Sequence, residues 1–192
     1  MLALAREAIV ERRVTGAGGE PVVGATVRVK MGNESFPDAS TNYAGRYRVR
    51  GLPPGRAQVE LSRTGALNRR ARTELREGET ALADFVLAAG SIRGRVTEEG
   101  SPVAGTSVLV RNLAVPEEQS YVHADGDGLF LITGLPPGRY DVHARGRRGT
   151  ILDARPKEVE VGLGESVCDI DLSTRTSVEV RGARRGSPRG IA

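Results

Sequence analysis

Hydrophobic and polar residues alternate along many short stretches of the 192-residue chain. In the clearest stretch, Arg46 to Arg50, Tyr47 and Val49 alternate with three arginines, so a strand there places the two apolar side chains on one face. Gly, Pro and Asp bound these stretches at the close spacing typical of an all-β sandwich. Strands are predicted over residues 8–14, 25–31, 38–43, 45–51, 56–62, 70–76 and 80–87, and over residues 91–97, 106–112, 119–124, 128–134, 139–145, 155–161 and 166–172. Residues 2–13 have helix-forming composition, but we expect a tail that leads into the first strand.

The second half of the chain repeats the first. The hexapeptide GLPPGR occurs at residues 51–56 and again at 134–139, and other matches, such as Val14-Thr15 with Val96-Thr97, keep an offset of 81 to 86 residues. A nearly constant offset indicates two folded units with variable loops. We expect a tail over residues 1–7, domains over 8–89 and 90–173, and the truncated start of a third repeat or a tail over 174–192. The chain is accordingly interpreted as a fragment of a larger protein.

The GLPPGR motif predicts a reversal of the chain. Pro54 presets a φ of about −65° at the first central position of a turn, and Gly55 can adopt the positive φ of the second position of a type II turn. An alternating strand follows each copy of the motif. The motif is therefore expected to form a hairpin corner in both domains.

These features together resemble the carboxypeptidase regulatory-like domain, and the matching stretches are residues 21–29 with 42–57 and residues 102–110 with 125–140. The resemblance implies an all-β fold of two tandem seven-stranded Greek-key β-sandwiches, prealbumin-like (transthyretin-like) and similar to starch-binding domains. It also implies an accessory domain of secreted peptidases, outer-membrane receptors or bacterial surface proteins. Such a module carries no catalytic signature that could be transferred.

A neighbouring family, the collagen-adhesin B-type pilin and adhesin domains, locks the same sandwich with a Lys–Asn isopeptide bond. The first strands here, which end at Val14 and Val96, offer Arg where such a domain needs Lys, and residues 83–87 and 168–172 contain no Asn. We expect no crosslink of this kind. An intact mass about 17 Da below the sequence mass, the loss of one ammonia, would contradict this expectation.

The composition argues against an aromatic-walled pocket, because aromatic residues make up 4% of the chain and Trp is absent. The formal net charge is +4, and Arg supplies nearly all of the positive charge. This Arg content either reflects a GC-rich coding sequence or serves an anionic partner such as nucleic acid, acidic polysaccharide or lipopolysaccharide. The 24 acidic residues interspersed with 28 basic ones argue against a strong field of one sign.

Catalytic chemistry is not predicted. Cys168 alternates with Ile170 and Leu172 and is expected to be a buried, inert thiol, whereas His123 and His143 lie on different strands. The first copy has neither His nor Cys, and the usual nucleophile, metalloprotease and phosphate-loop motifs are missing. We expect no enzyme activity and no cofactor. No window is apolar enough for a membrane span or a signal peptide in this segment.

Two further motifs have competing interpretations. Asp125 and Asp127 are weak calcium candidates, because alternate carboxylates followed by Gly can wrap a hard cation. A tight Asp-Gly turn is favoured, since a strand follows directly and the first copy has residues 42–45, NYAG, at that place. The Arg-Gly runs at residues 145–149 and 181–186 resemble segments that bind single-stranded nucleic acid, but no aromatic residue adjoins them, so nucleic acid is not favoured as a partner.

A comparison of the two copies gives a candidate interaction surface. Leu109, Leu129 and Leu131 stand at the outward positions that carry Arg28, Arg46 and Arg48 in the first copy. We hypothesise that the second copy buries this surface against a neighbouring domain or a partner. Alternatively, a bulge between residues 128 and 134 turns these leucines inward.

The sequence thus favours a non-catalytic structural or binding module of a larger protein of the bacterial envelope or exterior. With almost no linker at residues 87–91, it is expected to act as a semi-rigid spacer or a protein-interaction domain. Its partners would be neighbouring domains of the same polypeptide, another protein or a glycan. The alternative is a carbohydrate-binding accessory domain, for which Tyr121 is the only aromatic candidate near a loop.

Overall fold

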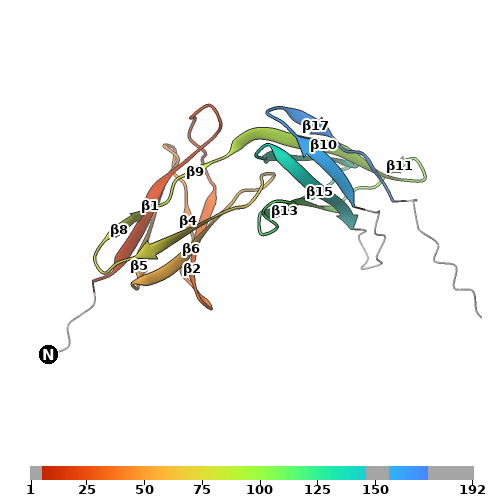
Figure 1. Ribbon diagram of the computed structural model, residues 1–192. Helices are drawn as coiled ribbons and strands as arrows, with labels where there is room; N and C mark the ends of the chain where they lie inside the picture. The colour runs from red at the N-terminus through yellow and green to blue at the C-terminus, as the bar shows by residue number, and fades with distance from the viewer. Residues whose placement is uncertain (1–5, 146–155, 173–192) are drawn as a thin grey trace, which may run out of the picture.

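The computed structural model describes residues 6–145 and 156–172. Two β-units follow one another along the chain, and β10 (Ala88–Glu98) leads from the first into the second (Figure 1). Within the described residues no helix is long and apolar enough to cross a membrane.

The first unit is a sandwich of two sheets. One sheet has β1 (Ala8–Thr15) at its centre, paired with β5 (Arg46–Leu52) on one side and with β8 (Thr80–Leu82) and β9 (Phe85–Val86) on the other. The second sheet has the order β3-β2-β6-β7, and β4 also pairs with β2; its strands are β2 (Thr26–Met31), β3 (Glu34–Ser35), β4 (Ala39–Ser40), β6 (Gly55–Ser62) and β7 (Arg69–Leu75). Because β3 and β4 pair successively with β2, and β8 and β9 with β1, each pair is one interrupted strand of a seven-stranded sandwich.

The second unit repeats this arrangement. Its first sheet has β10 at its centre, between β14 (Leu129–Gly134) and the successive strands β17 (Glu165–Val167) and β18 (Ile170–Asp171), with β11 (Ser101–Pro102) folded back on the end of β10. Its second sheet has the order β13-β12-β15-β16; the strands are β12 (Ser107–Asn112), β13 (Gln119–His123), β15 (Gly138–Arg145) and β16 (Lys157–Val161). The prediction of two tandem β-sandwiches is confirmed.

Each sandwich encloses its own apolar core. Alternate positions of the central strands are buried, such as Val10 and Val14 on β1 and Ile92 and Val96 on β10. One residue departs from this division. Leu67, from the loop between β6 and β7 of the first unit, is buried in the core of the second.

The last strand of each sandwich is interrupted, where the sequence predicts a continuous strand. In the second unit the interruption brings the Cys168 carbonyl so close to β10 that a Cβ on Gly94 would lie 1.9 Å from it. In the first unit Arg12 occupies the equivalent position, and its Nε lies 3.1 Å from the Asp84 carboxylate in the gap between β8 and β9. The predicted strand over residues 38–43 is likewise reduced to the two residues of β4.

The GLPPGR corners turn the chain but do not form the predicted hairpins, because β5 and β6, like β14 and β15, lie in different sheets of their sandwich. The corners also differ from a type II turn. Gly55 and Gly138 have φ values of +138° and +156°, whereas a type II turn needs about +80°. Both glycines already belong to the strands that follow, β6 and β15. The preceding Gly51 and Gly134 have φ values of +75° and +76°, so each corner starts with a second glycine-specific bend.

Candidate functional site

The three leucines of the predicted interaction surface do not lie together. Leu129 and Leu131 are on β14, and their side chains are 44% and 50% exposed on the outer face of the β14-β10-β17 sheet. Leu109 is half-buried on β12, which belongs to the other sheet of the sandwich. The outer faces of two packed sheets point in opposite directions, so the structure divides this surface into two.

The face with Leu129 and Leu131 combines exposed apolar side chains with two arginines, Arg93 and Arg95, on β10. Arg93 on β10 lies directly between Leu131 on β14 and Val167 on β17, which is 60% exposed. The Arg93 Nε lies 2.5 Å from a Glu165 carboxylate oxygen. A row of exposed apolar side chains therefore crosses this sheet, interrupted by one ion pair at its middle.

The face with Leu109 contains a buried carboxylate. Leu109 lies between Tyr121, which is 56% exposed, and His143 on the neighbouring strands. The adjacent Asp141 is buried, and its Oδ2 accepts hydrogen bonds from Arg111 at 2.7 Å and faces His143 Nε2 at 2.9 Å. The Arg111 guanidinium thus offsets the charge of Asp141 and joins β12 to β15, while Asp141 Oδ1 is buried and makes no hydrogen bond.

The equivalent outer face of the first unit is basic instead of apolar. On the β5-β1-β8 sheet, Arg46 stands opposite Arg13, and Arg48 stands opposite Glu11, with Arg48 Nε 3.1 Å from the Glu11 carboxylate. Arg50 continues the row along β5 and is exposed. We call these residues, Glu11, Arg13, Arg46, Arg48 and Arg50, the arginine face. It adjoins an open hollow of about 790 Å³ that Arg13, Arg46 and Arg48 help to line.

An exposed aromatic residue, Tyr43, lies at the end of the arginine face. It is 92% exposed, and it projects from the turn between β4 and β5. The sequence reasoning missed this residue because it considered the turn only as a counterpart of the Asp125 motif. A lone Tyr in an Asn-Tyr-Ala-Gly turn, next to an arginine strand, is the signal that could have found it.

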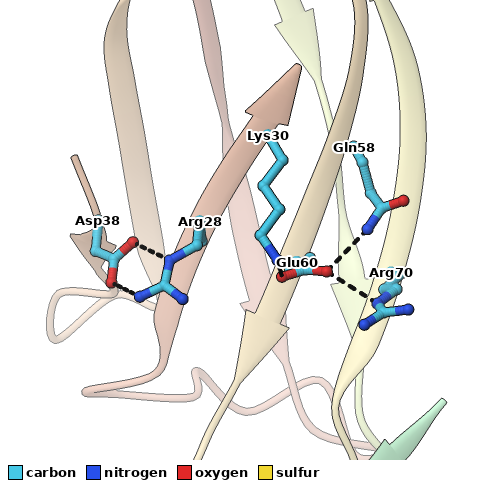
Figure 2. Close-up of polar contacts among 6 residues, drawn as sticks. All are labelled: Arg28, Lys30, Asp38, Gln58, Glu60 and Arg70. Atoms are coloured by element: carbon cyan, nitrogen blue, oxygen red, sulfur yellow. Dashed lines mark hydrogen bonds and ion pairs between the residues drawn. The ribbon is translucent and has the colours of Figure 1, made fainter. Parts of the chain in front are cut away.

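Charged side chains also cover the other sheet of the first unit, and several of them form ion pairs there. Figure 2 shows Glu60 held by Lys30 at 2.8 Å, by Arg70 at 3.0 Å and by the Gln58 amide at 2.8 Å. Arg28 binds Asp38 through two hydrogen bonds of 2.8 and 2.6 Å (Figure 2). The hydrogen bond from Arg28 holds the pKa of Asp38 below its usual range.

The net effect on Glu60 is similar to that on Asp38. Partial burial by itself raises the pKa of Glu60, but the hydrogen bonds from Lys30 and Gln58 and the charges of Lys30 and Arg70 together outweigh burial and leave the pKa below its usual value. Ion pairs therefore tie β2 to β6 and β6 to β7 across the outer face of this sheet.

The calcium candidates lie in a turn that the first unit builds without any carboxylate. Asp125 Oδ1 accepts hydrogen bonds from the amides of Asp127 at 3.0 Å and Leu129 at 2.9 Å. Asn42 Oδ1 accepts the same two bonds in the first unit, from Ala44 and Arg46. No group of three potential metal-ligating side chains occurs in the described part of the chain. The contacts of Asp125 are therefore explained by the turn alone.

The residues considered for catalysis are dispersed. Cys168 is buried, and burial raises the pKa of its thiol, which keeps it protonated and unreactive. His143 faces Asp141 on the outer side of β15, while His123 is exposed on β13. In the described residues these side chains do not form a nucleophile–base pair. Of the two Arg-Gly runs, residues 146–149 and 181–186 lie outside the described residues.

Several hydrogen bonds join the two sandwiches at their junction. The loop between β6 and β7 forms a short parallel bridge with β14: the Leu67 amide donates to the Thr133 carbonyl at 3.0 Å, and the Thr133 amide donates to the Gly65 carbonyl at 2.8 Å. The Thr133 and Ser120 hydroxyls donate to the carbonyls of Gly65 at 3.0 Å and Ala66 at 2.9 Å. We call residues 64–68 the docking loop.

Side chains reinforce this junction. Leu67 and Ala66 are each 1% exposed, and the Arg69 Nε lies 2.9 Å from a carboxylate oxygen of the buried Glu118. Burial, together with the nearby Glu118 charge, raises the pKa of Tyr140 to about 12, and the Tyr140 hydroxyl donates to the Pro136 carbonyl at 2.8 Å. The docking loop therefore packs against apolar, hydrogen-bonding and charged groups of the second sandwich.

The peptide that joins the sandwiches is also fixed. Leu87 is buried in the first core, Ala88 pairs with Gly134 at the start of β10, and the Leu135 amide donates to the Gly90 carbonyl at 3.0 Å. A Cβ on Gly134 would lie 3.5 Å from Leu87 and 3.8 Å from Ala66, so the corner of the second unit contacts both connections. The two sandwiches are therefore joined in two places, by the docking loop and by the start of β10, and not by a free linker.

A family profile for the carboxypeptidase regulatory-like domain matches residues 10–88 and again residues 91–173. The chain belongs to the carboxypeptidase regulatory-like domain family. The two matches confirm that the family domain occurs here in tandem. A search of curated protein sequences finds no match to the chain.

Similar solved structures include the Bacillus anthracis TIE protein, with 16% identity, a TM-score of 0.38 and coverage of 87% of this chain and 34% of that one. A streptococcal ancillary pilin has 14% identity, a TM-score of 0.37 and coverage of 88% and 63%. The minor pilin GBS52 of Streptococcus agalactiae has 12% identity, a TM-score of 0.41 and coverage of 87% and 96%. The chain thus spans about a third of the TIE structure and less than two thirds of the ancillary pilin.

Proposed function

We propose that this tandem pair of carboxypeptidase regulatory-like domains is a non-catalytic, semi-rigid spacer within a larger modular protein of the bacterial cell envelope or exterior. The observation that carries the proposal is the docking loop, which buries Leu67 of the first sandwich in the core of the second. Four hydrogen bonds surround this loop, and a second connection runs through β10. Two domains joined in this way keep a fixed relative orientation, whereas domains joined by a flexible peptide reorient freely.

A spacer also needs outer faces that neither react nor aggregate. The ion pairs of the β3-β2-β6-β7 sheet supply such a face, since every charge of Figure 2 has an opposite partner. The buried thiol and the dispersed histidines give no support to catalysis. These features favour extension and positioning over chemistry.

Residual dipolar couplings of the full chain test this proposal. If the module is semi-rigid, amides of both sandwiches fit one common alignment tensor. Two tensors of clearly different magnitude would mean independent tumbling and would contradict the spacer function. Export of the parent protein, followed by cell fractionation, tests the proposed location separately.

We also propose that the apolar face of the second sandwich, with Leu129, Leu131 and Val167, contacts a neighbouring protein domain. Leu129 and Leu131 lie on β14, the same strand whose Thr133 end binds the docking loop, so this face is continuous with an existing interface. Exposed apolar clusters of this kind mark protein contacts. Hydroxyl-radical footprinting of Leu129 and Leu131 should show protection in the parent protein relative to this chain alone, and equal reactivity would refute the contact.

A further inference from the structure

The arginine face is charged in excess of its own acidic partners. Arg48 is paired with Glu11, and Arg13 Nε donates to the Ala44 carbonyl at 3.0 Å, which leaves the positive charge of Arg13 without a carboxylate. Within the described residues, Arg46 and Arg50 are exposed and make no side-chain ion pair. Four guanidiniums against one carboxylate give this sheet face an excess of three positive charges.

The contrast with the rest of the molecule shows that this excess is local. Residues 8–87 contain 13 basic and 9 acidic residues, a formal charge of +4, while residues 88–172 contain 9 basic and 13 acidic residues, a formal charge of −4. The same sheet face in the second sandwich carries Leu129, Leu131 and Thr133 in place of Arg46, Arg48 and Arg50. The second sandwich also carries two arginines on this face, Arg93 and Arg95 on β10, but Arg93 is paired with Glu165, and the row of three arginines on one strand is particular to the first sandwich.

The geometry of β5 spaces the cations regularly. Outward side chains on a strand recur every second residue, about 7 Å apart, so Arg46, Arg48 and Arg50 form a straight row on one face. Guanidinium groups bind carboxylates and phosphates through two parallel hydrogen bonds. A row of this kind suits an extended polymer with repeated anionic groups better than a single small anion.

Tyr43 is held in place at the end of this row. The Asn42 side chain fixes the turn through the amides of Ala44 and Arg46, and the Gly45 amide donates to the Asn42 carbonyl at 2.8 Å. Gly45 has a φ of +71°, and a Cβ there would lie 2.5 Å from the Val14 carbonyl oxygen. The turn is therefore rigid. Tyr43 is 92% exposed, so the apolar surface of its ring stays in contact with water, which is unfavourable.

These features distinguish between classes of anionic polymer. Single-stranded nucleic acid needs successive aromatic platforms for successive bases, and the arginine face has one. Protein partners need an apolar, desolvated centre, and in the described part of this sheet the half-exposed apolar side chains are Leu82 and Val86, on the separate short strands β8 and β9. One exposed aromatic ring beside a row of guanidiniums fits a sugar ring followed by acidic groups.

We propose that the arginine face, with Tyr43, binds an acidic polysaccharide. The guanidiniums of Arg46, Arg48 and Arg50 pair with its anionic groups, and the Tyr43 ring packs against a sugar. This binding activity goes beyond the spacer function and does not depend on the orientation of the two sandwiches. Failure of one proposal therefore leaves the other intact.

Isothermal titration of the full chain with polygalacturonate, at low and at physiological salt, tests the proposal. Neutral dextran, oligo-dT and polyglutamate serve as comparison ligands. The decisive variant is Arg46→Gln/Arg48→Gln, and the matched control is Arg56→Gln/Arg72→Gln, which removes the same charge from exposed positions on the other sheet. Tyr43→Ser tests the sugar platform.

We expect polygalacturonate to bind and dextran not to bind. Arg46→Gln/Arg48→Gln should weaken binding about tenfold, as expected for the loss of two exposed ion pairs, with less than about a twofold change in the control pair. Tyr43→Ser should weaken binding to the polysaccharide but not to polyglutamate. Equal losses of affinity in the two double variants would show that binding depends on net charge alone, and would contradict a site on the arginine face. Stronger binding to oligo-dT or polyglutamate than to polygalacturonate, or no binding at low salt, would overturn the proposal.

Discussion

Replacing Leu67 by Ala tests how strongly the docking loop couples the two sandwiches. Leu67 is 1% exposed, and its side chain packs in the second core although it belongs to the first unit. Truncation of a fully buried Leu to Ala costs about 2–5 kcal/mol of unfolding free energy, from lost apolar burial and the residual cavity. The second core loses that contribution, and the backbone bridge to Thr133 loses its apolar anchor.

Urea unfolding followed by circular dichroism measures the total loss, and amide hydrogen exchange locates it. In Leu67→Ala the Thr133 amide, which donates to the Gly65 carbonyl, should exchange much faster than in the wild type, while amides in the centre of β12 stay protected. Leu163→Ala is the matched control, because Leu163 is 78% exposed and its truncation should change stability by less than about 0.5 kcal/mol. If Leu67→Ala behaves like Leu163→Ala, and Thr133 keeps its protection, the docking loop does not couple the domains.

Four further predictions concern the junction, the charged face and the turns. Arg69→Ala should destabilise the chain by about 1–3 kcal/mol in urea, because it leaves the buried Glu118 carboxylate without its partner, and Arg69→Ala/Glu118→Gln should recover part of the loss. The pKa of Glu60 is lowered in the folded state, so its stabilisation is complete above the ordinary Glu pKa and is lost as pH falls through the folded value. Stability of Glu60→Gln should therefore fall less than that of the wild type between about pH 5 and about pH 3; parallel curves would refute the pairing. Gly45→Ala should lower the melting temperature strongly, because of its φ and the nearby Val14 carbonyl, whereas Gly126→Ala, with open space around it, should not. Calcium at millimolar concentration should leave the melting temperature unchanged, and a clear rise would restore the metal hypothesis.

The sequence was sufficient to predict the sandwiches because alternation and turn residues are local signals. Val27 and Val29 on β2, like Val108 and Val110 on β12, are buried as a period of two requires. The interruption of the last strands could not be predicted in the same way. It involves contacts between residues far apart in the chain, Cys168 with Gly94 in the second unit and Asp84 with Arg12 in the first.

The candidate surfaces were predicted only in part, for a related reason. Alternation correctly places Leu129 and Leu131 outward, but it cannot tell which sheet a strand joins, so Leu109 was grouped with them although β12 lies in the other sheet. The docking loop left almost no sequence signal. Ala66 and Leu67 form a short apolar pair within a polar loop, and only the approach of the second sandwich gives Leu67 a core to enter.

The most direct test of the spacer proposal is the distribution of distances between spin labels on the two sandwiches. Labels at Glu74→Cys and Leu163→Cys, in a Cys168→Ala background, report across the junction from exposed positions. We predict one narrow distance distribution for the otherwise intact chain, and a broad one when Leu67→Ala is added. A distribution that is already broad with Leu67 present would contradict the claim that the two domains form one semi-rigid unit.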